Sequence, residues 1–173
     1  DISDYWEAVR GQYAAFESGM QAPSSEVYLH EMPGGQFTNL KEQARALGIE
    51  NARWPEVAHA YQQVNEMFGD IVKVTPSSKV VGDLAIVMVT SGITREQIED
   101  PAAEVPFPQS VVQLFSGELG QPFGGFPAAL QKKILKGAKP FTKRWGEVMP
   151  PADLDKARAD AEQAFGSSIT ENQ

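Results

Sequence analysis

Residues 55–69 read PEVAHAYQQVNEMFG, and this stretch sets the fold class. Proline suits the first turn of a helix, and glycine commonly ends one. Between them, four apolar residues recur three or four positions apart, which places them on one face of a helix. The sequence therefore predicts an amphipathic helix over 56–68 that packs on a core through Val57, Tyr61, Val64 and Phe68.

Outward from this helix, Gly and Pro divide the chain into further segments with helical spacing. One helix should follow Pro33-Gly34-Gly35, bury Phe37, Leu40, Ala44 and Leu47, and end at Gly48. Further helices are predicted over 3–18 (with Gly19 as its stop and a polar turn over 21–25), 79–91, 109–115, 128–136 and 151–165, and a short one opens at Thr94 with Gln97 in capping-box position. The predicted fold is all-α, an irregular helical bundle of six to eight helices.

Two segments could be extended instead. Ile71 to Val74 alternates like a strand, and residues 75–78 could then cap the helix over 79–91. Residues 26–32 are too short for a stable helix. A single four-residue strand has no visible parallel partner, so the helical interpretation is favoured. The helix over 79–91 should bury Val80, Val81, Leu84, Ala85 and Met88.

Composition excludes several classes of function. The 173 residues are 42% hydrophobic and 22% charged, which indicates a packed core. A formal net charge of -8 disfavours binding to nucleic acid or to anionic lipid. The chain has no Cys and no apolar run that could cross a bilayer. Because it begins at Asp1 without Met, we expect it to be a piece of a longer protein.

The residues that commonly carry catalysis are sparse. His30 and His59 lie 29 positions apart with no metal-binding spacing, so no metal site is expected within this chain. Residues 74–79 are vaguely similar to a phosphate loop but lack the glycines that would cradle a phosphate. No nucleophile elbow is present.

The sequence PGGQFTNL over 33–40 remains as a candidate. Two glycines before a helix let other groups approach the backbone, and the first helical amides favour an oxyanion such as a carboxylate or an enolate. The helical wheel places Thr38 opposite the apolar stripe, toward a groove or solvent. A Thr at this place is usually a cap, but Asn39 and Glu42 could form the capping pair and leave the Thr38 hydroxyl free.

Several long motifs in this chain strongly resemble the conserved carboxylase region of the pyruvate carboxylase family. They are EMPGGQFTNL over 31–40, FGDIVKVTPSSKVVGD over 68–83, FPQSVV over 107–112, GELGQP over 117–122 and GGFP over 124–127. The resemblance runs from Tyr5 to about Leu154. One departure is Arg144-Trp145-Gly146, where the family often has Arg-Pro-Gly, and it weakens the match to the family's tetramerisation region.

The resemblance implies that residues 1–138 are the helical extension that caps a TIM barrel, and that 139–173 are a linker and the start of the following region. In that family the barrel supplies the divalent metal, and biotin arrives on a separate carrier domain. The implied activity is carboxyl transfer from carboxybiotin to pyruvate, giving oxaloacetate for gluconeogenesis, in an ATP-using ligase that is a homo-oligomer, a tetramer. Its location would be the cytoplasm, or the mitochondrial matrix in a eukaryote.

By the same resemblance, Thr38 matches the threonine that relays a proton between the pyruvate methyl group and the biotin ureido nitrogen. Lys41 and Glu42, one turn further on, are candidate contacts for biotin, although a solvated helix face explains them as well. No metal ligand is expected in this chain, and the chain alone should be inactive.

Two alternatives stay open at this point. The chain could be a non-catalytic module that packs on the barrel and guides the biotin carrier. It could also be the same region of an oxaloacetate decarboxylase or a transcarboxylase. In each case an exposed apolar patch should mark where a barrel sits, and Tyr5, Trp6, Ile71 and Val74 are candidates for it.

Overall fold

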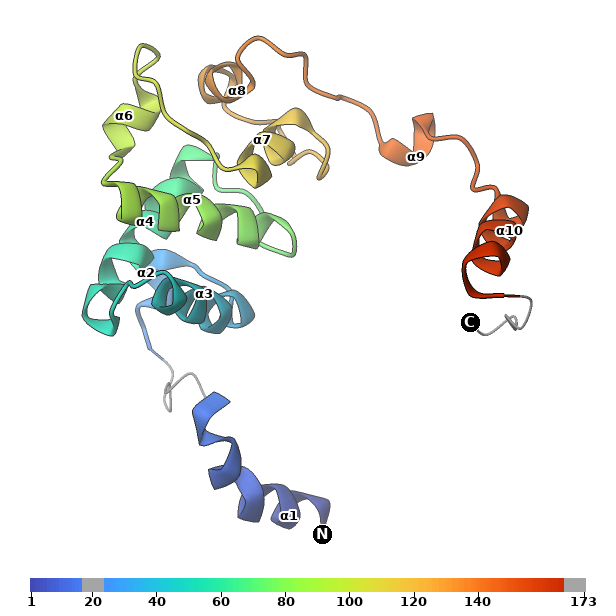
Figure 1. Ribbon diagram of the computed structural model, residues 1–173. Coiled ribbons are helices and arrows are strands. Elements are labelled where there is room, and N and C mark those ends of the chain that lie inside the picture. Colours follow the sequence, from blue (N-terminus) through green and yellow to red (C-terminus); the bar gives the residue numbers. More distant parts are fainter. Residues whose placement is uncertain (17–23, 167–173) are drawn as a thin grey trace. The chain divides into compact units, whose positions relative to one another are not determined.

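The computed structural model describes residues 1–16 and 24–166 and divides into two units, residues 1–142 and 143–173 (Figure 1). The first unit begins with α1 (Ile2–Val9) and a 3-10 helix (Arg10–Phe16). It continues with α2 (Val27–His30), α3 (Gly34–Ala46), a 3-10 turn (Asn51–Arg53), α4 (Trp54–Met67), α5 (Ser77–Ser91), α6 (Arg95–Glu99), α7 (Gln109–Ser116) and α8 (Ala128–Leu135). The second unit contains α9 (Trp145–Val148) and α10 (Leu154–Phe165).

The predicted all-α class is confirmed, since the described ranges contain helices and no strand. The ten α-helices found there exceed the predicted six to eight. Two of the extra ones, α2 and α9, are single turns of four residues, too short to show a helical period in the sequence. The possible extended segment over 26–32 is not found, because Val27–His30 form α2.

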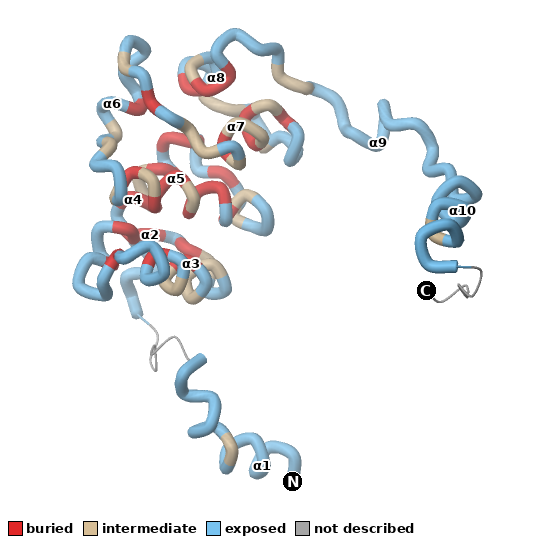
Figure 2. The backbone as a smooth tube through the Cα atoms, viewed as in Figure 1, coloured by how far each residue is buried: buried red, intermediate tan, exposed pale blue. Residues whose placement is uncertain are grey.

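The core lies on α4 and α5, where Figure 2 shows much of the buried backbone. All four residues predicted to face inward from α4 are completely buried, and so are Val81, Leu84 and Ala85 of α5. Around this pair, α3 and α7 pack on α5, α2 packs on α4, and α8 packs on α7. Burial of these apolar side chains is the main contribution to the stability of the first unit.

A close approach between α3 and α5 depends on Gly82. A β-carbon added there would lie 2.8 Å from Nε2 of Gln36 and 2.9 Å from a methyl carbon of Leu40. Real β-carbons essentially never come this close, so any larger residue at position 82 would force the Gln36 and Leu40 side chains to move. Leu40 is completely buried at this crossing, which anchors the middle of α3.

Three aromatic rings join α7 to the rest of the core. Phe115 of α7 is completely buried, and its ring meets Phe68 edge-on at 4.8 Å between centroids. On its other side it stacks on Phe126 at 4.4 Å. Aromatic pairs at such distances add to the free energy gained by burial alone.

A lysine connects α6 to α8. The Lys133 ammonium donates to the carbonyls of Gln97, Ile98 and Asp100 at 2.6–2.9 Å. These carbonyls lie at the C-terminal end of α6, where the helix dipole favours a cation. The other end of α6 has the predicted capping box between Thr94 and Gln97.

The segment before α5 differs from its predicted structure. Residues 71–74 do not pair as a strand, and Pro76 is the N-cap of α5, with no side-chain cap from any described residue. The predicted cap by residues 75–78 is therefore wrong. Ser77 instead holds the preceding loop, since its Oγ accepts from the Val74 amide at 3.1 Å and donates to the Val72 carbonyl at 2.7 Å.

The predicted apolar patch is found in part. Tyr5, Trp6 and Val74 are more than half exposed. Ile71 is only 6% exposed, so its place in the patch is wrong, and its neighbour Val72 is 81% exposed instead. Leu47, predicted to be buried by α3, is exposed as well.

The first predicted helix is only partly observed. α1 and the 3-10 helix bury none of their residues. The predicted end of that helix, its stop at Gly19 and most of the following turn lie outside the described residues. In the parts of the chain that the structure describes, no helix is both long enough and apolar enough to cross a bilayer.

Candidate functional site

The candidate site is built on the turn that enters α3. Glu31 closes α2 in a left-handed conformation, with φ 53° and ψ 23°. Pro33 then acts as the N-cap of α3 with φ -59° and ψ 144°, and the helix itself begins at Gly34. Proline cannot continue the preceding helix, and its fixed φ suits this boundary.

The N-terminus of α3 is open. No side chain from the described residues caps it, and the first amide bonded back to the turn is that of Phe37, which donates to the Pro33 carbonyl at 2.8 Å. A β-carbon placed on Gly34 or Gly35 would meet nothing within 4 Å. Both glycines are exposed, so a flat ring or a carboxylate has room to approach these amides.

Thr38 lies at this open end and is half-buried. Its hydroxyl donates to the Gly35 carbonyl at 3.1 Å, one turn earlier in the same helix. The lone pairs of its oxygen remain available as acceptors, because a hydroxyl both donates and accepts. The hydroxyl is therefore accessible, but the prediction that it is free of its own backbone is wrong.

The predicted capping pair of Asn39 and Glu42 is also wrong. Because α3 begins at Gly34, Asn39 lies inside the helix and cannot be its N-cap. Glu42 is half-buried and pairs instead with Arg45, three residues later. Lys41 is half-buried too and forms no ion pair with a described residue. Helical spacing places Thr38, Lys41 and Glu42 on one face of α3.

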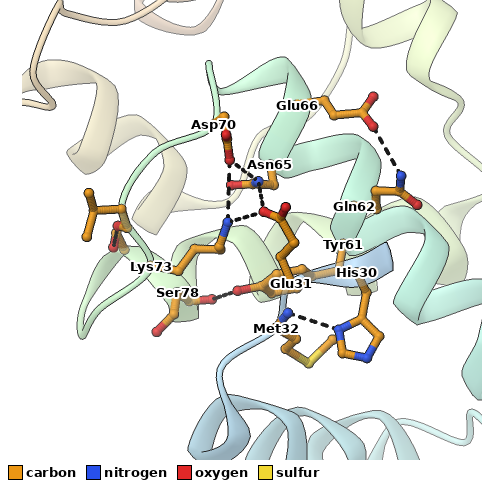
Figure 3. A network of polar contacts seen from close by, with 12 residues as sticks. His30, Glu31, Met32, Tyr61, Gln62, Asn65, Glu66, Asp70, Lys73 and Ser78 are labelled. Atoms are coloured by element: carbon orange, nitrogen blue, oxygen red, sulfur yellow. Dashed lines mark hydrogen bonds and ion pairs between the residues drawn. The ribbon is translucent and has the colours of Figure 1, made fainter. Parts of the chain in front are cut away.

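Two histidine contacts hold the turn from the side of α2. Nδ1 of His30 accepts from the Met32 amide at 2.9 Å, and Met32 is buried (Figure 3). The His30 ring also packs on Phe37 at 5.7 Å between centroids, and Phe37 meets Trp54 edge-on. The imidazole therefore fixes the backbone just before Pro33.

A second group of polar side chains joins the turn to the end of α4 (Figure 3). The Lys73 ammonium lies 2.8 Å from Oε2 of Glu31 and 3.5 Å from Oδ1 of Asp70. Asn65 donates to the same two oxygens, at 3.4 Å to Glu31 and 2.8 Å to Asp70. The Asn65 and Lys73 donors lower the pKa of the Asp70 carboxyl below its usual value.

Sequence reasoning missed Lys73 and Asn65. Glu31 and Lys73 are 42 positions apart, and no local spacing relates them. Both residues lie in or beside motifs that carry the family resemblance, but a motif gives no distance between segments. His30 and His59 both line a cavity of about 190 Å³ next to this group, together with Glu26 and Gln62.

Because His30 is buried, we expect the stability of the chain to depend on pH. Burial lowers its pKa below the usual 6.5, and the nearby Glu26 partly opposes this shift. The unfolded chain then binds a proton more readily than the folded one. The free energy of unfolding should be constant above pH 7 and should fall as the pH drops through 6.5, until it levels off below the folded pKa. Urea unfolding of the chain between pH 5 and 8 measures this.

The matched control is His59, the exposed histidine on the same cavity. His59→Gln should leave the slope between pH 5.5 and 6.5 unchanged, whereas His30→Gln should reduce it. An equal slope in the wild type and in His30→Gln would contradict this account of the turn.

Side chains that bind metals are not clustered in the described residues. These residues contain no group of three or more His, Asp or Glu side chains that could hold an ion. The open turn at Gly34 and Gly35, with the Thr38 hydroxyl beside it, instead has space and polar atoms for a planar ligand with a carbonyl or carboxylate.

Comparison with known proteins gives consistent results. Residues 27–173 match the family described as the conserved carboxylase domain. The chain is 49% identical over 170 residues to pyruvate carboxylase of Bacillus subtilis, covering 98% of this chain and 15% of that protein. It is 44% identical over 172 residues to human mitochondrial pyruvate carboxylase, covering 98% of this chain and 14% of that protein. The chain thus spans about a seventh of the length of these curated relatives.

Solved structures agree. The carboxyl transferase domain of Rhizobium etli pyruvate carboxylase, determined with pyruvate and biocytin, matches with a TM-score of 0.90 and 60% identity, covering 98% of this chain and 28% of that one. The complete multifunctional pyruvate carboxylase of the same organism matches with the same TM-score and identity and is covered to 16%.

Proposed function

The chain belongs to the conserved carboxylase domain family, and we propose that it forms the helical part of a carboxyl transferase domain that carboxylates pyruvate. The observation that carries this proposal is the open, glycine-lined turn with the Thr38 hydroxyl at its edge. The likeness to a carboxyl transferase domain determined with pyruvate and biocytin supports it.

In this proposal Thr38 moves a proton. Carboxybiotin, when bound, would supply CO2 to the methyl carbon of pyruvate after that carbon has lost a proton, and loss of CO2 would leave a basic ureido nitrogen. Oγ1 of Thr38 donates its proton to that nitrogen and accepts the proton that leaves the pyruvate methyl group. A neutral hydroxyl can do both without resting as a charge, and positioned proton transfer of this kind is typically worth ~10²- to 10⁴-fold in rate.

The contact with the Gly35 carbonyl suits this role. It holds the hydroxyl in one orientation before substrate arrives and is weak enough to be exchanged, since a neutral hydrogen bond contributes about 1 kcal/mol net. The uncapped amides of α3 favour the negative oxygen that develops on pyruvate as its methyl proton leaves. Lys41 and Glu42, on the same face as Thr38, are proposed contacts for biotin.

Other parts of the parent protein complete the site. We assign the divalent metal to a TIM barrel and biotin to a carrier domain, both outside this chain, and expect the parent to be a homo-tetramer. Residues 1–138 would cap the barrel, and 139–173 would lead into the next region. The exposed Tyr5, Trp6, Val72 and Val74 are the surface proposed to meet the barrel. The parent would act in the cytoplasm, or in mitochondria as its human relative is named.

An assay of the full-length protein tests the reaction. With pyruvate, bicarbonate, ATP and Mg²⁺, it should form oxaloacetate, and omission of ATP should abolish product formation. Only a carboxylase carries its own ATP-driven carboxylation of biotin. Failure to form product with ATP, together with ATP-independent loss of the carboxyl group of added oxaloacetate, as CO2 or to an added acceptor, would assign the chain to a decarboxylase or a transcarboxylase instead. The chain of 173 residues alone should form none.

A further inference from the structure

We propose that Lys73 is a positioning residue for Thr38, acting through its ion pair with Glu31 on the turn that enters α3. The proposal rests on the function proposed for Thr38 and extends it to a residue that does not touch the substrate. Lys73 lies on the loop between α4 and α5, far from α3 in the sequence.

The ammonium group sits between two carboxylates at a protected place. Its side chain is 13% exposed, whereas Glu31 and Asp70 are each at least half exposed. Lys73 thus reaches inward from a loop whose neighbours Val72 and Val74 point to solvent. Because its two partners are exposed, the pair contributes little free energy, and its expected role is to fix the distance between the loop and the turn.

Both acidic partners have a left-handed backbone. Glu31 has φ 53° and Asp70 has φ 52°, and neither is a glycine. This conformation costs a side-chain-bearing residue free energy, so other contacts must hold it. Lys73 and Asn65 contact both carboxylates (Figure 3). The two contacts to Glu31 join its turn to the end of α4, and the two contacts to Asp70 are local to that end.

The path from Lys73 to Thr38 is short. Glu31 is two residues before Pro33, the N-cap of α3, and Thr38 is one turn into that helix. Further along, Leu40 is fixed against Gly82 of α5. Thr38 therefore lies between the Glu31 contact and Leu40, on a turn that His30 and Phe37 also hold. In this proposal, loss of the Lys73 pair loosens that turn and shifts the start of α3 relative to Leu40. Misplacement of a catalytic group by about 1 Å can cost up to about 10²-fold in rate.

A simple contribution to stability would explain the same contacts, so the test must separate the two roles. In the full-length enzyme, carboxyl transfer to pyruvate is measured separately from ATP-dependent carboxylation of biotin, with the melting temperature of each variant. Lys73→Met keeps the length of the side chain and removes its charge. We expect a loss of between about tenfold and a hundredfold in kcat for transfer, with biotin carboxylation unchanged. Lys73→Arg should restore most of the lost rate.

Lys79→Met is the matched control. Lys79 lies on α5 and forms an ion pair of 2.7 Å with Asp83, four residues later, which is similar in length to the Lys73–Glu31 pair. Both partners of this control pair lie on α5 and not on the turn that enters α3. This variant should leave both rates within about twofold of the wild type. Glu31→Gln removes the charge of the other partner and should lower the transfer rate as Lys73→Met does. The proposal can therefore still be tested if the Lys73 variant folds poorly.

The decisive comparison uses Thr38→Ala as the background. If Lys73 acts through Thr38, Lys73→Met should cause no further loss of transfer once the hydroxyl is gone. An equal further loss in that background, or a loss in Lys79→Met as large as in Lys73→Met, would overturn the proposal. If Thr38→Ala itself retains full transfer, the proposed function fails, which is a different result from an active Lys73→Met beside an inactive Thr38→Ala.

Discussion

Thr38→Ala should lower carboxyl transfer by ~10²- to 10⁴-fold in the full-length protein and leave ATP-dependent carboxylation of biotin intact. This equals about 2.7–5.5 kcal/mol in the barrier to transfer. The expected cause is the loss of the only group on this face of α3 that can both donate and accept a proton at neutral pH without becoming charged. Stability should change little, because the hydroxyl is half-buried and bonds only to its own helix.

The measurement compares the two half-reactions in one preparation. Thr38→Ser keeps the hydroxyl and should retain most of the transfer rate. Asn39→Ala, one position further and exposed, should leave transfer unchanged. Oxaloacetate formation at a near-normal rate by Thr38→Ala would refute the relay and leave the chain as a packing or carrier-docking module.

Phe115→Ala should have the largest effect on folding, a loss of about 3–5 kcal/mol in the free energy of unfolding. The ring is completely buried and lies between Phe68 and Phe126, so its removal leaves a cavity and breaks two aromatic contacts. Because α7 packs on both α5 and α8, the released helix should also loosen α8. Urea unfolding of the chain, followed by circular dichroism, measures the change.

The control is the exposed aromatic residue of the same region. Phe123 projects fully into solvent, so Phe123→Ala should change the free energy of unfolding by less than about 0.5 kcal/mol. A Phe115 variant as stable as this control would mean that the three rings do not form part of the core.

Periodicity in the sequence was enough for the long helices. The inward faces of α4 and α5 were predicted residue by residue, because each of these helices repeats its apolar stripe over several turns. Apolar periodicity cannot reveal a helix that is only one turn long, such as α2. It also misled for Leu47, the last residue of a correct stripe, since α3 ends before that position reaches the core.

Only those features of the candidate site that depend on neighbouring residues in the sequence could be predicted. Thr38, Lys41 and Glu42 share a face by helical spacing, which can be read directly. The hydrogen bond of Thr38 to Gly35 depends on the helix beginning at Gly34, and Asn39 seemed an equally good start in the sequence. Lys73 could not be found at all, because its partner at Glu31 is brought near only when α4 and its following loop have folded.

Where α3 crosses α5, the side chains of Gln36 and Leu40 lie close to the backbone of Gly82. A side chain added at position 82 would have to move the ends of the Gln36 and Leu40 side chains, and because Leu40 is completely buried, a small shift of the helix that carries the hydroxyl is expected. Substitutions at position 82 should therefore change the position of the Thr38 hydroxyl slightly, while the groups that contact pyruvate keep their chemical identity.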